Sequence, residues 1–190
     1  MGGAWRAKGR ERGLDAELRR LDPEALGDHI DRLYRAAWAM TGSREDAEDL
    51  VQETYARVLA KPRFLRGGDD LGYLLRVLRN THISRLRAAG RRPSGVPFAE
   101  EAPEPIDERA TWRPEAGLDV VALFEVIAGL PEVFRDVLVA VDVAGLSYAE
   151  ASRALKVPEA TVTSRLFRAR RQAASGMESR APGVMGRERT

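Results

Sequence analysis

Residues 147–171 read SYAEASRALKVPEATVTSRLFRARR, and this stretch decides the fold of the C-terminal part of the chain. Ser147 and Glu150 have the spacing of a capping box, in which each side chain binds the backbone N–H of the other residue and a helix begins. Lys156-Val157-Pro158 ends this helix, because proline disfavours helical geometry in the residue before it. A longer helical pattern starts directly afterwards, at Glu159. The sequence therefore predicts a helix-turn-helix.

The second helix of this unit has two distinct faces. One face is apolar and consists of Val162, Leu166, Ala169 and Ala173 at helical spacing. Another face carries hydroxyl and guanidinium groups from Thr161, Ser164, Arg165 and Arg168. Residues 156–171 hold five basic residues and one acidic residue, a local charge of +4. Such groups contact base edges and phosphates, so we expect this helix to lie in the major groove of DNA rather than to be a merely solvated basic helix.

The composition is typical of a soluble helical protein. The chain has 190 residues, of which 44% are hydrophobic, 32% charged and 6% aromatic, and few segments alternate with a period of two. It has no cysteine, which excludes disulfides and thiolate metal sites and fits a reducing compartment. Apolar runs stay short of the roughly 20 residues that a membrane helix needs. We expect a cytoplasmic protein without membrane insertion.

Helical periodicity and turn residues divide the chain into five segments. We predict a mobile N-terminal segment over 1–21, a helical domain over 22–89, a linker over 90–117, a second helical domain over 118–174 and a flexible tail over 175–190. The linker has five prolines and many acids, so it buries too little apolar surface to fold alone. The predicted fold class is all-α, with two small helical domains joined by an acidic, proline-rich linker and a helix-turn-helix in the second domain.

The first domain contains two neighbouring helices of opposite charge. Residues 45–53 carry five acidic side chains, which suit a basic protein surface. Residues 74–92 carry six arginines and no acid, which suits a phosphate backbone. Each pattern, taken alone, is equally typical of a solvated helix face. His82 lies in the arginine-rich helix, where we expect contact with nucleic acid or solvent.

Four stretches together resemble the bacterial extracytoplasmic-function (ECF) sigma factors. They are EDAEDLVQET at 45–54, YLLRVLRN at 73–80, SYAE at 147–150 and TVTSRLFRAR at 161–170, in the order of the family. The resemblance spans about residues 26–171 and includes both domains. It implies a non-enzymatic protein that binds core RNA polymerase, recognises the −35 and −10 promoter elements and promotes strand opening, with no cofactor, metal site or catalytic residue. It also implies an anti-sigma factor as a partner.

The resemblance assigns roles to particular residues. On the polymerase, the clamp helices of the largest subunit would receive Asp46, Asp49, Gln52 and Glu53, and the flap region would also be contacted. The −35 element would be bound by Thr161, Thr163, Ser164, Arg165, Arg168 and Arg171. The −10 element would be bound by Phe64, Arg76, Arg79, Asn80, Arg85 and Arg87. Within this set, Phe64 is the aromatic candidate in a loop that captures a base flipped from the duplex.

The chain departs from the family pattern at several positions, and parts of it also fit two other functions. Tyr73 stands where tryptophan is usual, Ser84 where aspartate is frequent, Lys156 where glycine is usual and Thr163 where lysine is usual. A helix-turn-helix regulator acting without core polymerase would explain the last domain but not the paired helices of the first. A Mg²⁺-dependent nuclease would use the acids at 45–53, but these are more typical of a solvated or protein-binding face.

Overall fold

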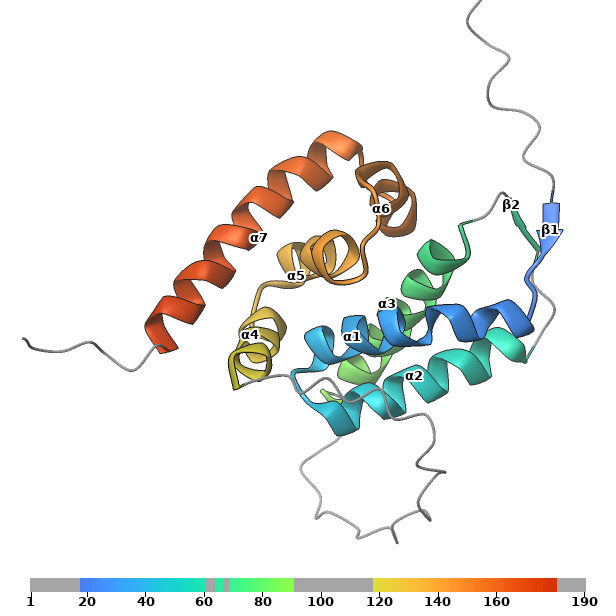
Figure 1. The fold of residues 1–190 in the computed structure, drawn as a ribbon, viewed down its shortest axis with the longest axis horizontal. Helices are drawn as coiled ribbons and strands as arrows, with labels where there is room; N and C mark the ends of the chain where they lie inside the picture. Colours follow the sequence, from blue (N-terminus) through green and yellow to red (C-terminus); the bar gives the residue numbers. More distant parts are fainter. Residues whose placement is uncertain (1–17, 61–63, 67–68, 91–117, 181–190) are drawn as a thin grey trace, which may run out of the picture.

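The computed structural model describes residues 18–60, 64–66, 69–90 and 118–180 (Figure 1). The first half begins with a short strand β1 (Leu18–Arg20) and a 3₁₀ helix η1 (Glu24–His29). These are followed by the helices α1 (Ile30–Thr41) and α2 (Arg44–Leu59), the strand β2 (Phe64–Arg66) and the helix α3 (Asp70–Ala89). In its second half, α4 (Leu118–Ala128), α5 (Glu132–Leu138), the π-helical segment η2 (Val139–Val143), α6 (Tyr148–Leu155) and α7 (Glu159–Arg180) follow. The predicted all-α class with two helical domains is confirmed.

In the first domain, α1, α2 and α3 pack against one another around a core of leucine and alanine side chains. Ser43 caps α2 and Asp69 caps α3, where its carboxylate accepts a hydrogen bond of 3.1 Å from the backbone N–H of Gly72. Gly42 ends α1 with φ +76°, a conformation that glycine adopts without strain. A Cβ at Gly42 would lie 3.1 Å from Cβ of Ala128 on α4, so this turn also lets the second domain approach closely.

The first helical domain does not begin with an α-helical turn. Leu26 is buried, but Ile30, four residues later, is 48% exposed. The reason is that Leu26 lies in the 3₁₀ helix η1, which has three residues per turn, so the α-helical spacing does not continue across Ile30.

The end of the N-terminal segment also differs from the expectation of a mobile stretch over 1–21. Residues 18–20 form β1, which pairs antiparallel with β2, and Leu21 is buried in the core. This two-stranded ladder was not expected from the sequence, because strand pairing across 44 or more residues leaves no local signal. Residues 1–17 lie outside the described part of the chain, as do the predicted linker from residue 91 onwards and the last ten residues.

The second domain contains the expected helix-turn-helix. The Ser147 hydroxyl accepts from the backbone N–H of Glu150 at 3.3 Å, and the Glu150 carboxylate accepts from the backbone N–H of Ser147 at 2.8 Å, which confirms the capping box. Lys156 in the turn has φ +56°, the left-handed conformation that glycine favours. The carbonyl of Pro158 then accepts from the N–H of Val162 at 3.0 Å as α7 begins.

The helix α7 runs to Arg180, six residues beyond the expected end at residue 174. Its last turns pack on α4, and a Cβ at Gly176 would lie 2.6 Å from a methyl carbon of Val126, so this glycine permits the close approach of the two helices. Arg180 binds the Glu125 carboxylate at 2.7 Å. Packing on α4 therefore extends α7 past the point that the apolar stripe alone indicated.

The two domains pack directly against each other (Figure 1). The helix α1 contacts α4 and η2, and α3 contacts α6. At the centre of this interface, the rings of Trp38 and Phe124 meet edge to face with centroids 4.9 Å apart. Arg32 extends the interface by donating to the carbonyls of Ala144 at 2.7 Å and Gly145 at 3.0 Å. Within the described residues, no helix is long and apolar enough to cross a membrane.

Candidate nucleic-acid interface

The helix α7 presents the predicted −35 residues on the side away from the core. Val162, Leu166, Ala169 and Ala173 are buried. Of the predicted contacts, Thr163, Ser164, Arg168 and Arg171 are exposed, while Thr161 and Arg165 are half-buried. The hydroxyls of Thr163 and Ser164 donate to backbone carbonyls of their own helix at 3.1 and 3.2 Å, so their oxygens remain able to accept a further hydrogen bond. The structure thus brings the −35 set together on one helix.

Phe167 is a residue of this face that the sequence interpretation missed. Its side chain is 64% exposed, and the Arg171 guanidinium carbon lies 6.0 Å from its ring centroid. It is one turn from Ser164 and Arg171, so all three share the outer side of α7. The available signal was an aromatic side chain outside the apolar stripe of Val162 and Leu166. In general, an apolar side chain on a helix that enters the major groove can contact a thymine methyl group.

Arg170, by contrast, is paired within the second domain, although its side chain is 53% exposed. It forms two hydrogen bonds, of 2.8 and 2.7 Å, with the carboxylate of Asp142 on η2. These bonds and the charge of Asp142 raise the pKa of Arg170. All three arginines, Arg168, Arg170 and Arg171, are exposed, and the ion pair with Asp142 is what distinguishes Arg170.

Two of the predicted −10 arginines contact the second domain. Arg76 donates to the carbonyls of Ala154 at 3.2 Å and Arg153 at 2.9 Å, at the end of α6. Arg79 donates to the Asp136 carboxylate and, at 2.7 Å, to Glu132, both on α5. Burial raises the pKa of Asp136, although its hydrogen bond with Arg79 works in the opposite direction. The face of α3 that carries these arginines is therefore occupied by the helix-turn-helix domain.

A third predicted −10 arginine pairs with the predicted polymerase-binding helix. Arg85 binds the Glu53 carboxylate at 2.6 Å and the carbonyl of Asp49 at 2.9 Å. Burial acts to raise the pKa of Glu53, but hydrogen bonds and charges from Arg85 and Arg57 outweigh it and lower the pKa. Asp46, Asp49 and Gln52 have exposed side chains on α2. Of the four predicted polymerase contacts, Glu53 alone is half-buried and engaged with α3.

The remaining −10 candidates lie apart from one another. Phe64 on β2 is 63% exposed, and Asn80 and Arg87 on α3 are exposed. Arg76 and Arg87 are eleven residues apart on α3, a distance of about 16 Å along the helix at 1.5 Å per residue. The predicted −10 set therefore forms an extended track along α3 with the aromatic ring of Phe64 in the loop before it, rather than one compact site.

Comparisons with known proteins agree with this arrangement. The family model described as Sigma-70 region 2 matches residues 26–92, and the one described as Sigma-70, region 4 matches residues 121–172. The ECF RNA polymerase sigma factor SigM of Mycobacterium tuberculosis (strain H37Rv) is 32% identical over 176 residues, which are 85% of this chain and 84% of SigM. The chain belongs to the ECF sigma factors.

Other relatives and a solved structure support the same family. SigE of Mycolicibacterium smegmatis is 35% identical over 153 residues, covering 78% of this chain, and the match spans only 58% of the length of SigE. The sigma factor RpoE of Bartonella quintana, solved in complex with the anti-sigma factor NepR, has a TM-score of 0.65 and 25% identity, covering 82% of this chain and 95% of RpoE.

His82 on α3 is buried and does not lie on the surface that carries the predicted DNA contacts. His82 is 8% exposed, so the expectation of contact with nucleic acid or solvent is wrong for this side chain. Burial lowers the pKa of His82, and the charges of Arg135 and Arg85 lower it further. Among the described residues, no group of three or more histidine, cysteine, aspartate or glutamate side chains could hold a metal ion.

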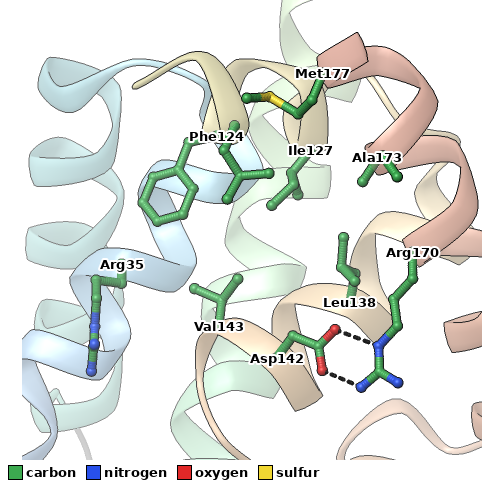
Figure 2. A pocket seen from close by; sticks show the side chains of 11 residues that line it. Arg35, Phe124, Ile127, Leu138, Asp142, Val143, Arg170, Ala173 and Met177 are labelled. Carbon is green, nitrogen blue, oxygen red and sulfur yellow. Dashed lines mark hydrogen bonds and ion pairs between the residues drawn. The ribbon is translucent and has the colours of Figure 1, made fainter. Parts of the chain in front are cut away.

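A cavity of about 420 Å³ lies between α1, α4, η2 and α7 of this sigma factor (Figure 2). Its walls are apolar apart from three side chains, Arg35, Asp142 and Arg170. Figure 2 shows the Asp142–Arg170 pair on one side of the cavity, near Leu138. Since Asp142 and Arg170 bind each other, the cavity wall offers apolar surface rather than an acid–base pair for chemistry.

Proposed function

We propose that this sigma factor binds core RNA polymerase, recognises the −35 and −10 promoter elements and promotes strand opening, so that transcription begins. The observation that carries the proposal is the exposed face of α7, where hydroxyls, guanidiniums and Phe167 stand on a capped helix-turn-helix. This face occurs in the same chain as the acidic helix α2 and the arginine-rich helix α3. A regulator acting without polymerase would need only the first of these features.

At the −35 element, α7 would lie in the major groove. Arg168 and Arg171 are exposed and carry planar guanidiniums that can donate two hydrogen bonds to one guanine. Ser164 would contact a base edge or a phosphate from the same side of the helix. The ion pair of Arg170 with Asp142 would keep α7 firmly oriented on its domain while the outer face contacts DNA.

At the −10 element, the exposed ring of Phe64 would stack on a base flipped out of the duplex, and Asn80, farther along α3, would offer a polar group to the same strand. Base stacking on an aromatic side chain contributes about 1–3 kcal/mol, which offsets the cost of unpairing. Arg76 and Arg79 would hold the phosphate backbone. Because Arg76 contacts α6 and Arg79 contacts α5 in the present arrangement, we propose that the second domain moves off α3 before the −10 strand binds.

The clamp helices of the polymerase largest subunit would be contacted by the predicted set on α2, which is Asp46, Asp49, Gln52 and Glu53. The second domain would contact the flap region. The polymerase performs the chemistry, so this protein acts without catalytic residues of its own, in the cytoplasm where the polymerase acts. We further propose an anti-sigma factor as a partner, since the similar RpoE of Bartonella quintana was solved with one.

Run-off transcription with purified core polymerase on promoter fragments from the source genome tests the proposal. The expected result is a promoter-specific transcript that depends on this protein. Asp49→Lys, at an exposed position, should weaken binding to core while leaving isolated −35 binding intact. Glu48→Lys is the matched control, because it reverses another exposed acid of α2 outside the predicted contact set. Tight operator binding without any binding to core would instead identify a conventional regulator, and cleavage of DNA with Mg²⁺ alone a nuclease.

A further inference from the structure

The loop that carries Phe64 is tied to the N-terminal segment of the chain. The strand β2 pairs antiparallel with β1, in the register Leu18 with Arg66, Arg19 with Leu65 and Arg20 with Phe64 (Figure 1). Each strand has only three residues. Because an isolated two-stranded ladder is marginally stable in water, this pairing needs further support from the rest of the domain.

That support comes from an ion pair beside the ladder. Nη2 of Arg19 donates to both carboxylate oxygens of Asp70, with 2.5 Å to Oδ1. Asp70 is the first residue of α3, and its side chain is only 10% exposed, whereas that of Arg19 is 43% exposed. A charge-assisted pair with one partner shielded from water is stronger than a fully exposed one. Arg19 therefore joins β1 to the beginning of α3.

The chain directly after β1 is anchored as well. Leu21 is 5% exposed and Leu26 is 3% exposed, both within the core. The carbonyl of Leu26 accepts a hydrogen bond of 2.9 Å from the hydroxyl of Tyr55 on α2. Burial of Leu21 fixes one end of β1, and the Arg19–Asp70 pair fixes its middle, so β2 has a firm partner strand.

We propose that Arg19 is a positioning residue for −10 recognition, which holds β1 on α3 and thereby sets the backbone of β2 and the ring of Phe64. Since Phe64 is 63% exposed, it depends chiefly on its backbone for its orientation. A ring held in place before DNA binds loses less conformational entropy on stacking, so the unpaired base is captured more tightly. This inference rests on the proposed role of Phe64 in base capture.

The test measures the affinity of the reconstituted holoenzyme for two DNA probes at one fixed salt concentration. One probe is a fork with the −10 non-template strand unpaired, and the other is a duplex with the −35 element alone. Arg19→Ala should weaken fork binding by about threefold to tenfold and leave duplex binding unchanged. Arg19→Lys keeps a charged donor and should recover most of the loss. Arg57→Ala, which also removes one exposed arginine from the first domain, is the control and should leave fork binding unchanged.

The decisive comparison is with Phe64→Ala. Since Arg19 acts through Phe64, the double variant Arg19→Ala/Phe64→Ala should bind the fork no more weakly than Phe64→Ala alone. Additive losses would overturn the inference and make Arg19 a direct DNA contact. A loss with Phe64→Ala but none with Arg19→Ala would overturn the positioning role and leave the proposed function standing. If neither variant weakens fork binding, base capture by Phe64 and the inference both fail, while a wild-type run-off transcript still supports the sigma function.

Discussion

Replacing Arg32 with alanine should shift this sigma factor towards a state in which its two domains are apart. Arg32 on α1 donates to the carbonyls of Ala144 and Gly145 at the end of η2, at 2.7 and 3.0 Å. It belongs to neither the predicted DNA contacts nor the predicted polymerase contacts. Arg32→Ala therefore perturbs domain packing while leaving Arg76 and Arg79 intact, and any gain in DNA binding can be traced to the release of α3.

The size of the effect follows from these two bonds. A hydrogen bond from a charged donor contributes about 1.5–3 kcal/mol, with less expected where water competes. The bond to Ala144 is partly buried and the bond to Gly145 is exposed. Their joint loss should cost about 2 kcal/mol, or roughly a 30-fold change in the ratio of closed to open molecules. If only open molecules bind the −10 strand, its affinity rises by up to the same factor.

The natural absence of cysteine makes the measurement direct. Ala56→Cys on α2 and Gln172→Cys on α7 lie at exposed positions, one in each domain, and can carry a fluorophore pair. Arg32→Ala should lower the energy-transfer efficiency and raise the affinity for a fluorescent −10 oligonucleotide, with Arg57→Ala as the control. Unchanged transfer and unchanged affinity would refute the idea that these contacts hold the domains closed, provided that thermal unfolding shows both variants folded.

Three further predictions concern the helix-turn-helix. Substituting uracil for a contacted thymine in the −35 element removes one methyl group, so it should weaken binding by the wild-type protein by about 1 kcal/mol. The same substitution should leave binding by Phe167→Ala unchanged. Equal losses for the two proteins would contradict contact between Phe167 and the methyl group. Lys156→Gly should raise the free energy of urea unfolding by up to about 1 kcal/mol, because glycine relieves the left-handed strain; a decrease would contradict this. Hydrogen bonds from the side chain and backbone of Ser147 lower the pKa of Glu150 in the folded protein. The stability that these bonds provide is therefore fully present above the ordinary pKa of glutamate, and it is lost as the pH falls through the lowered pKa of Glu150. By NMR titration, Ser147→Ala should return the Glu150 pKa towards 4.5; an unchanged titration would show that the side-chain bond is unimportant.

The helix-turn-helix could be predicted because its determinants are local. Ser147 and Glu150 are three residues apart, Pro158 acts on the residue before it, and the apolar stripe of α7 repeats within each turn. Lys156 adopts the glycine-like conformation that its position in the turn indicated. Interactions of this range depend little on the rest of the chain, so the sequence alone specifies them.

The binding partner of each arginine on α3 could not be predicted in the same way. Arg76, Arg79, Arg85 and Arg87 look equivalent as a basic run, yet the first three bind groups 78, 57 and 32 residues away in the chain. Which carbonyl or carboxylate lies opposite an arginine depends on domain packing. The sequence indicated a phosphate-binding helix, and only the folded chain shows that its neighbours occupy much of it.

The sequence by itself determined the all-α class, the capped helix-turn-helix and the family of this protein, because these depend on side-chain periodicity and on spacing within a few residues. Tertiary structure decided the rest. It made Phe167 exposed and His82 buried, and it paired β1 with a loop strand more than 40 residues away. Exposure and strand pairing are properties of surfaces brought together by the whole fold, and no local pattern encodes which surfaces will meet.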